Sequence, residues 1–264
     1  MIRALLVFAL FLASGSLYAK AACAGFHGKQ SYPPLSVGGG AICFIQEPIS
    51  DKNTGMSIGL DGIALYYIDN AGVSTKAEGP GLLYDDTPGE IVDAFLLEAG
   101  RDGRERIFVI HAFEVRASLA EPHSSGKFYS VTVFDLSDNV LRQNESFTDW
   151  FGAGYGWLSD GKNVIYRFPY QSRGDVLQAV RSPFSSLMEG AGKVSAEVRY
   201  KSYLSDWSSV RGKTKRYLAK GRLVEVVQVS AGWCRVDYFG SKKSNNMWLM
   251  CSALDAEASG KEAD

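Results

Sequence analysis

Short runs of β-branched and aromatic residues, separated by clusters of Asp, Asn and Gly, recur along the first two thirds of the chain. Such runs between turn residues are typical of β-hairpins. The predicted hairpins join 63–68 to 73–75, 91–97 to 106–113, 129–136 to a strand starting at 140, and 157–158 to 164–168. The pattern predicts a mostly β protein with a sheet-rich N-terminal domain over residues 22–192, whose hairpin repeats could form blade-like units.

Helical patterns are sparse in the same region. The segment Asp175–Arg181 can form two helical turns, and Pro183 would end them because proline lacks the backbone N–H that a helix interior needs.

The first residues indicate export. Arg3 precedes an uncharged apolar run over residues 4–13, which is too short to span a bilayer as a helix. Small residues follow, so we predict a signal peptide over residues 1–21, cleaved near Ala19 or Ala21, and a periplasmic mature chain. A lipoprotein anchored at Cys23 is the alternative, although Lys20 stands where a lipobox has an aliphatic residue. No later stretch predicts a membrane-spanning helix.

Cysteine usage agrees with export. The chain has four cysteines in two distant pairs, for which three connectivities exist. The simplest connectivity joins Cys23 to Cys43 and Cys234 to Cys251. A metal site would need closely spaced ligands, which these cysteines lack, so the sequence predicts structural disulfides and no metal.

Charge divides the chain into an acidic and a basic part. Residues 22–192 hold 13 Lys and Arg against 21 Asp and Glu, whereas residues 194–254 hold 11 against 4. The net charges are therefore −8 and +7, an asymmetry that bears on partners. It permits docking between the two parts. We predict a separate basic domain over residues 193–254 and a disordered polar tail over residues 255–264.

Four segments of the basic domain together form a motif. Its segments are Tyr203-Leu204, Lys215 to Val226, Gly232 to Tyr238 and Trp248 to Leu254. This pattern resembles the bacterial Src-homology-3-like (SH3-like) domain, which implies a small β-barrel, here closed by a Cys234–Cys251 disulfide. Two positions depart from the family pattern: Arg222 replaces an acidic residue and Met247 replaces glycine.

The resemblance also implies a ligand groove lined by aromatic residues. The groove candidates are Tyr203, Trp207, Tyr217 and Arg222, surrounded by further lysines and arginines. A solvated charged surface is the alternative for each of them. We expect Trp233 and Trp248 to belong to the core instead.

Candidates for catalysis have simpler structural interpretations. Ile107, Val109, His111 and Phe113 share one face of a predicted strand, which favours a hydrogen-bonded core histidine over a catalytic base. The loop 98–105 has a weak similarity to calcium-binding turns, but arginines intrude, and the acidic cluster 85–90 is typical of a solvated turn. We therefore predict no catalytic residues and no cofactor.

Three functions remain open from the sequence. The first is a non-enzymatic envelope protein that binds a protein partner, as an inhibitor or immunity protein does. The second is a peptidoglycan-binding accessory protein of the cell wall, since SH3-like domains often bind peptidoglycan and the basic domain is cationic whereas this polymer is acidic. The third is an uncharacterised envelope enzyme. Nucleic acid is not an expected partner of an exported protein.

Overall fold

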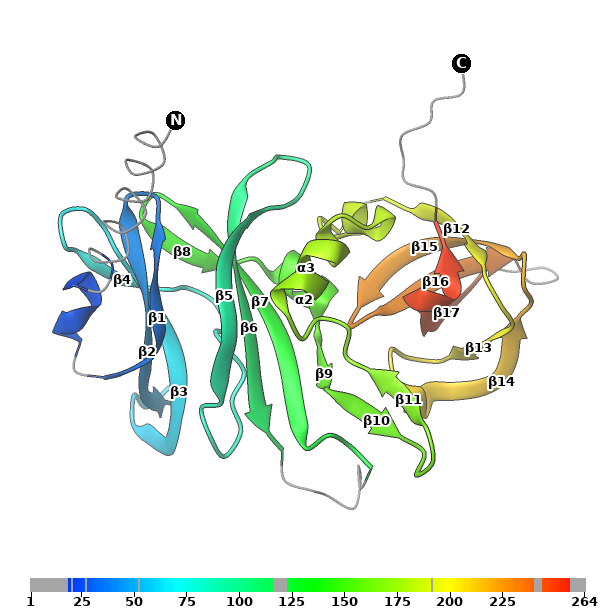
Figure 1. Cartoon of the computed structure of the whole chain (residues 1–264), viewed down its shortest axis with the longest axis horizontal. Helices are drawn as coiled ribbons and strands as arrows, with labels where there is room; N and C mark the ends of the chain where they lie inside the picture. Colours follow the sequence, from blue (N-terminus) through cyan, green and yellow to red (C-terminus); the bar gives the residue numbers. More distant parts are fainter. Residues whose placement is uncertain are drawn as a thin grey trace, which may run out of the picture. The chain divides into compact units, whose positions relative to one another are not determined.

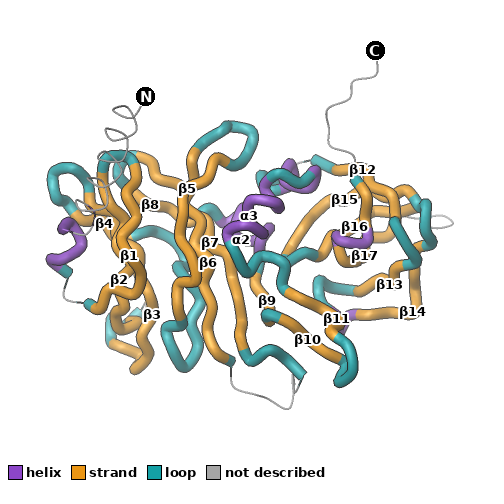
Figure 2. The backbone as a smooth tube through the Cα atoms, viewed as in Figure 1, coloured by secondary structure: helices purple, strands orange, loops and turns teal. Residues whose placement is uncertain are grey.

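Strands make up most of the structure, which is a computed structural model (Figure 2). It describes residues 19, 21–26, 28–51, 53–115, 123–190, 192–239 and 244–256. The prediction of a mostly β protein is confirmed. Most of the predicted signal peptide and the tail from residue 257 onward lie outside the described residues.

The chain forms two compact units. The first unit comprises residues 1–97, 105–114 and 132–144, and the second comprises 98–104, 115–131 and 145–264. The structure thus groups residues 145–192 with the C-terminal sheet, a grouping that the change of net charge near residue 192 does not reveal. The boundary at residue 192 stays a prediction about sequence domains.

A four-stranded antiparallel meander begins the first unit (blue and cyan in Figure 1). Its strands, in spatial order, are β1 (Lys29–Val37), β2 (Gly40–Ser50), β3 (Ser57–Ile68) and β4 (Ser74–Lys76). Gly38 and Gly39 join β1 to β2 with φ angles of 55° and 80°. Two residues with positive φ suit the twist of a tight hairpin, which is why glycine is favoured there.

The next strands form two more of the predicted hairpins. They are β5 (Glu90–Glu98), β6 (Glu105–Glu114), β7 (Lys127–Ser137) and β8 (Val140–Gln143), which neighbour one another in that order, with β9 (Ala153–Tyr155) also pairing with β7. Asp138 and Asn139 turn the chain from β7 to β8 in the left-handed region, at φ 53° and 59°. Asp and Asn tolerate this conformation better than most residues, so the predicted turn is confirmed.

The core of the first unit lies between these two sets of strands. Ile42 and Phe44 of β2 and Leu65 of β3 pack in one buried cluster with Ile107 of β6 and Phe134 of β7. Alternate residues of a strand face the same side, so the hairpins contribute one apolar face each. Strands of both sets therefore contribute side chains to one shared interior.

His111 lies inside the first unit, as predicted. Its side chain is 0% exposed, and its Nε2 lies 2.9 Å from the carbonyl oxygen of Pro88. Burial lowers the pKa of His111, although the contact with Pro88 and the charge of Glu90 act in the opposite direction.

The second unit contains a seven-stranded antiparallel sheet (yellow to red in Figure 1). Its spatial order is β14, β13, β17, β16, β15, β12, β18. The strands are β12 (Val194–Val198), β13 (Ser202–Ser205), β14 (Lys213–Leu218), β15 (Leu223–Ser230), β16 (Trp233–Phe239), β17 (Ser244–Met250) and β18 (Leu254–Asp255). Asp255, the first residue of the predicted tail, thus belongs to a strand.

Shorter elements precede this sheet. They are α2 (Glu145–Phe151), the hairpin of β10 (Trp157–Ser159) and β11 (Val164–Arg167), α3 (Arg173–Val180) and the 3-10 helix η2 (Pro183–Leu187). A capping box starts α3: Asp175 N donates to Ser172 Oγ, and Asp175 Oδ2 accepts from Ser172 N. Such a box satisfies free N–H groups of the first turn. The predicted helix near 175–181 is confirmed, whereas α2 was not predicted.

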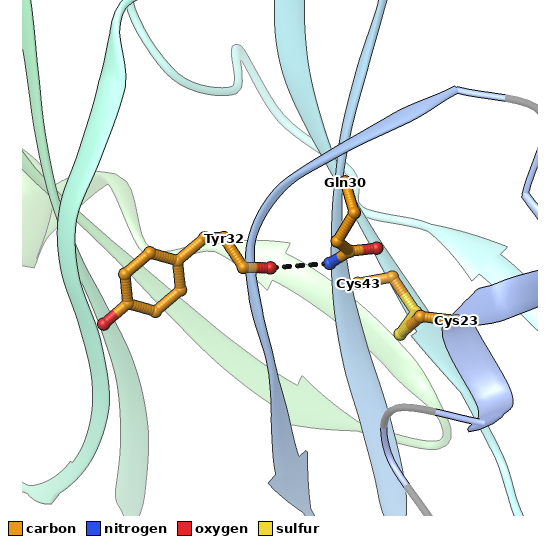
Figure 3. Close-up of a disulfide and its surroundings, with 4 residues drawn as sticks. All are labelled: Cys23, Gln30, Tyr32 and Cys43. Carbon is orange, nitrogen blue, oxygen red and sulfur yellow. Dashed lines mark hydrogen bonds between the residues drawn. A yellow bond between two sulfur atoms is a disulfide. The ribbon is translucent and has the colours of Figure 1, made fainter.

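Both predicted disulfides are present. Cys23, in the 3-10 helix η1 (Cys23–Gly25), is bonded to Cys43 on β2, with the Cα atoms 5.6 Å apart. Figure 3 shows this bond beside β1, where Gln30 Nε2 donates to the carbonyl oxygen of Tyr32 at 2.7 Å. Cys234 on β16 is bonded to Cys251 in the 3-10 helix η4 (Cys251–Ala253). Two such bonds indicate an oxidising, exported location.

No helix among the described residues has the length and apolar composition to cross a membrane.

Candidate functional site

Two exposed tyrosines lie side by side on the hairpin that ends the seven-stranded sheet. The register of β13 and β14 places Tyr203 opposite Tyr217, and directly opposed residues project on the same face. Their ring centroids are 6.1 Å apart with the ring planes at 65°. The residues remain 45% and 53% exposed. Strand pairing therefore holds an aromatic pair at the surface without burying it.

Two lysines place their ammonium groups over these rings. Lys201 Nζ lies 4.1 Å from the ring centroid of Tyr217 and 5.6 Å from that of Tyr203. Lys213 Nζ lies 4.8 Å from the ring centroid of Tyr203. The negative face of an aromatic ring attracts a cation at such distances. We call the surface formed by Tyr203, Tyr217, Lys201 and Lys213 the tyrosine–lysine face.

A groove of about 350 Å³ adjoins this face. Tyr203, Lys201 and Lys213 belong to its lining. The other lining residues are Asp160, Ile165, Tyr200, Ser202, Ser205, Val210, Trp233, Leu249, Met250 and Ala253. The groove therefore has an apolar floor with ammonium groups at its edge, an arrangement that suits a partner with both apolar and acidic side chains.

Asp160 is the acidic member of the described lining. Its carboxylate accepts hydrogen bonds from the backbone N–H groups of Asn163 and Lys162 at 2.8 and 2.9 Å. These bonds lower its pKa, so the group is ionised at neutral pH. Two lysines and one aspartate leave the lining with a net positive charge, and an acidic partner is therefore favoured.

Trp207 lies in the loop after β13 and is 56% exposed. Gly212 packs closely against Trp207, because a Cβ atom at Gly212 would lie 3.1 Å from the indole nitrogen. Asp206 N also donates to the carbonyl oxygen of Gly212 at 3.0 Å. Trp207 is therefore an exposed aromatic on the same hairpin, although it is not among the groove-lining residues.

Arg222 lies in the turn between β14 and β15. Its carbonyl oxygen accepts from Val198 N on β12 at 3.0 Å, and its own N–H donates to Ala219 at 3.3 Å. Arg222 does not line the groove. Of the four groove candidates, Tyr203 lines the groove, and Tyr217 pairs with it without belonging to the lining. Trp207, on the same hairpin, and Arg222, in the next turn, do not line the groove.

Lys201 was missed as a site residue. It stands two positions before Tyr203, and this spacing puts two side chains of an extended segment on the same face. That spacing could have revealed it. Ile165 could not have been found in this way, because β11 and β13 are 35 or more residues apart in the sequence and approach only through the tertiary fold.

The described part of the chain shows no group of three or more His, Cys, Asp or Glu side chains that could hold a metal ion. The two core candidates differ: Trp233 is buried, whereas Trp248 is partly exposed, with the guanidinium of Arg235 6.0 Å from its ring.

Comparison of the chain with protein-family models, with curated proteins and with solved structures finds no match.

Proposed function

We propose that this chain is an exported, non-enzymatic binding protein of the bacterial envelope that binds an acidic protein partner through the tyrosine–lysine face. The proposal rests on the pair of exposed tyrosines. They lie beside a groove, and a lysine ammonium group lies over each ring. Exposed tyrosine is enriched at protein interfaces, where it supplies rigid contact area. An inhibitor or immunity protein of the periplasm would use such a surface.

A wall polymer is the competing partner, and the position of the lysines over the rings argues against stacking of its sugars. Sugars are bound by stacking on open aromatic faces. Here Lys201 Nζ covers one face of Tyr217 at 4.1 Å from the centroid, and Lys213 Nζ lies 4.8 Å from the centroid of Tyr203. A sugar on these faces would have to displace the ammonium groups. A carboxylate of a protein partner would instead meet them directly.

The resemblance to SH3-like domains is part of the proposal. Its motif segments fall on successive strands of the seven-stranded sheet: Tyr203-Leu204 on β13, Lys215 to Leu218 on β14, Leu223 to Val226 on β15, Trp233 to Tyr238 on β16 and Trp248 to Met250 on β17. This order supports a barrel of that type, and the groove of the face is then the ligand groove of the module.

The experiment compares two kinds of binding with one set of variants. The mature chain is immobilised and exposed to an extract of envelope proteins, and it is separately sedimented with purified peptidoglycan. The test variant is Lys201→Glu with Lys213→Glu. Lys220→Glu is the control, because this exposed lysine lies outside the groove lining.

We expect the wild type and Lys220→Glu to retain one defined protein, which salt releases. The double variant should not retain it. Salt sensitivity follows because exposed charges are screened beyond about 10 Å at 0.1 M ionic strength. Sedimentation with peptidoglycan that is lost in the double variant would instead support the wall polymer. Retention of the same proteins by all variants would exclude the tyrosine–lysine face as the binding surface.

A further inference from the structure

A second hollow in the second unit has a volume of about 540 Å³. It lies beside α3, η2 and the hairpin turn between β15 and β16, and it is separate from the tyrosine–lysine face. Its lining shares only Met250 with the groove. A volume of this size is typical of sites for small ligands.

Aromatic rings form an apolar floor. Trp150 and Tyr170 lie with their ring centroids 5.6 Å apart and their planes at 28°. Trp150 Nε1 donates to the carbonyl oxygen of Phe184 at 3.2 Å, and the Tyr166 hydroxyl donates to that of Ala231 at 3.0 Å. Because these polar atoms already have partners in the protein, the floor offers a ligand mainly its apolar surface.

The wall formed by the β15–β16 turn is fixed in place. Ala231 has a φ of 51°, in the left-handed region that a residue with a Cβ rarely adopts. The hydrogen bond from Tyr166 holds this residue. A Cβ at Gly232 would lie 2.7 Å from Pro169, so the turn packs directly on that ring. A wall held in this way needs little ordering when a ligand binds.

Two arginines line the hollow without counter-ions. Arg167 and Arg199 are exposed, and neither side chain has an ion pair or hydrogen bond with another described residue. The carboxylate of Asp175 is engaged by Ser172, whose N and Oγ donate to it at 2.9 and 2.7 Å. Asp255 is the other acidic residue of the lining. The two aspartates balance the two arginines in formal charge, but the carboxylate of Asp175 already has protein donors whereas the two guanidinium groups have no partner among the described residues, so the guanidinium groups are the ones left to bind an anion.

The lining also contains neutral polar side chains. Gln178, Ser182 and Ser252 add an amide and two hydroxyl groups. Such groups suit the N–H and C=O groups of a peptide better than the methylene chain of a fatty acid, which has nothing to hydrogen-bond.

We propose that this hollow binds the free C-terminus of a peptide whose last side chain is apolar. The guanidinium groups of Arg167 and Arg199 pair with the terminal carboxylate, since guanidinium and carboxylate form charge-assisted hydrogen bonds. The apolar side chain lies on the floor of Trp150 and Tyr170, and the neutral polar side chains bind the peptide groups. This site is independent of the tyrosine–lysine face.

The test titrates the isotope-labelled mature chain with acetyl-Ala-Phe and with its C-terminal amide, and follows the indole N–H of Trp150 and the amide of Gly232 by NMR. We expect the free acid to bind at least about tenfold more tightly than the amide, because one charge-assisted pair contributes about 1.4 kcal/mol. Arg167→Gln with Arg199→Gln should remove this preference. Arg181→Gln, outside the lining, should keep it.

Equal binding of the acid and the amide would overturn the assignment to the arginines. Tighter binding of octanoate than of the peptide acid would overturn the assignment to peptides. No spectral change with the acid at millimolar concentration, or changes confined to residues outside the lining, would overturn the site itself. None of these results concerns the tyrosine–lysine face. Tyr217→Ser, which changes that face, should leave the peptide titration of the second hollow unchanged.

Discussion

Two places, one in each unit, treat their ionisable and aromatic side chains in opposite ways. The first unit buries His111 completely and leaves Arg106 only 5% exposed. The second unit keeps Tyr203 and Tyr217 at the surface under the ammonium groups of lysines. Antiparallel hairpins build both units, so secondary structure does not decide the difference. The difference lies in which side chains face the interior. The buried His111 makes the stability of the first unit depend on pH, whereas the second unit keeps two tyrosines at its surface.

Arg106 shows how the first unit accommodates a buried charge. Its Nε lies 3.0 Å from Asp135 Oδ1, and the Asp135 side chain is 37% exposed. Nε donates no hydrogen bond to this oxygen, so the two groups attract each other as opposite charges at short distance. A buried cation needs such a partner because leaving water is costly for a charge.

The largest expected effect comes from removing a disulfide. Because each unit contains one, removing them one at a time also tests the two units separately. Replacing Cys234 and Cys251 by serine should lower the free energy of unfolding of the second unit by about 3 kcal/mol, from the loop entropy that the bond removes from the unfolded chain. Cys23→Ser with Cys43→Ser is the matched control and should cost about the same in the first unit, since the sequence separations of 17 and 20 residues are similar. Hydrogen exchange in urea measures each unit separately.

If either double variant weakened amide protection equally in both units, the two units would unfold together. The two units would then not be independent in stability.

The next effect concerns binding. Tyr203→Ser with Tyr217→Ser should weaken binding of the protein partner by about 30-fold, corresponding to the loss of about 2 kcal/mol at an interface centre. The free energy of unfolding should change by less than about 0.5 kcal/mol per residue, because exposed side chains contribute little to folding. Binding is measured by calorimetry and stability by urea unfolding.

Leu223→Ser is the control for this pair, because Leu223 is 72% exposed and does not line the groove. Binding by the tyrosine variant at wild-type strength would show that the partner uses another surface.

The smallest effect is the pH dependence of the first unit. Burial lowers the pKa of His111 below its usual 6.5, so the folded state holds this ring neutral. The unfolded state binds a proton as pH falls through 6.5, and stability is lost below that pH. Between pH 7.5 and 5.5 the wild type should lose up to about 1.4 kcal/mol more than His111→Gln. Urea unfolding at the two pH values measures this difference.

His123→Gln is the matched control, because His123 is exposed. This variant should keep the pH dependence of the wild type. An unchanged dependence in His111→Gln would contradict the account of the buried histidine.

Turn residues made the hairpins predictable. Asp138 and Asn139 adopt left-handed conformations that few other residues tolerate, so their position marks the end of a strand. Gly38 and Gly39 also have positive φ angles, but the hairpin that they join was not predicted. The helix α2 was not predicted, because Glu145–Phe151 is rich in aromatic residues. Judged by intrinsic propensity alone, such residues favour strands. Phe147, Trp150 and Phe151 of α2 are buried, and tertiary packing decides this segment.

The candidate site was predictable only in part. Tyr203 and Tyr217 follow from the motif, and their pairing follows from a hairpin. The second hollow could not be predicted, because it is built from α3, η2 and the ends of β11, β15 and β17, whose approach no local pattern encodes. The compact units also depend on long-range contacts, which is why residues 145–192 join the C-terminal sheet despite their difference in charge.

The most direct test of the central claim is cross-linking in the cell. A photoreactive benzoyl-phenylalanine replaces Tyr217 in the full chain, and the same group at Tyr84, an exposed residue of the first unit, is the control. We expect position 217 to give a protease-sensitive adduct that is absent from position 84 and is lost with Lys201→Glu and Lys213→Glu. An adduct removed by peptidoglycan digestion, or the same adduct from both positions, would contradict binding of a protein partner at the tyrosine–lysine face.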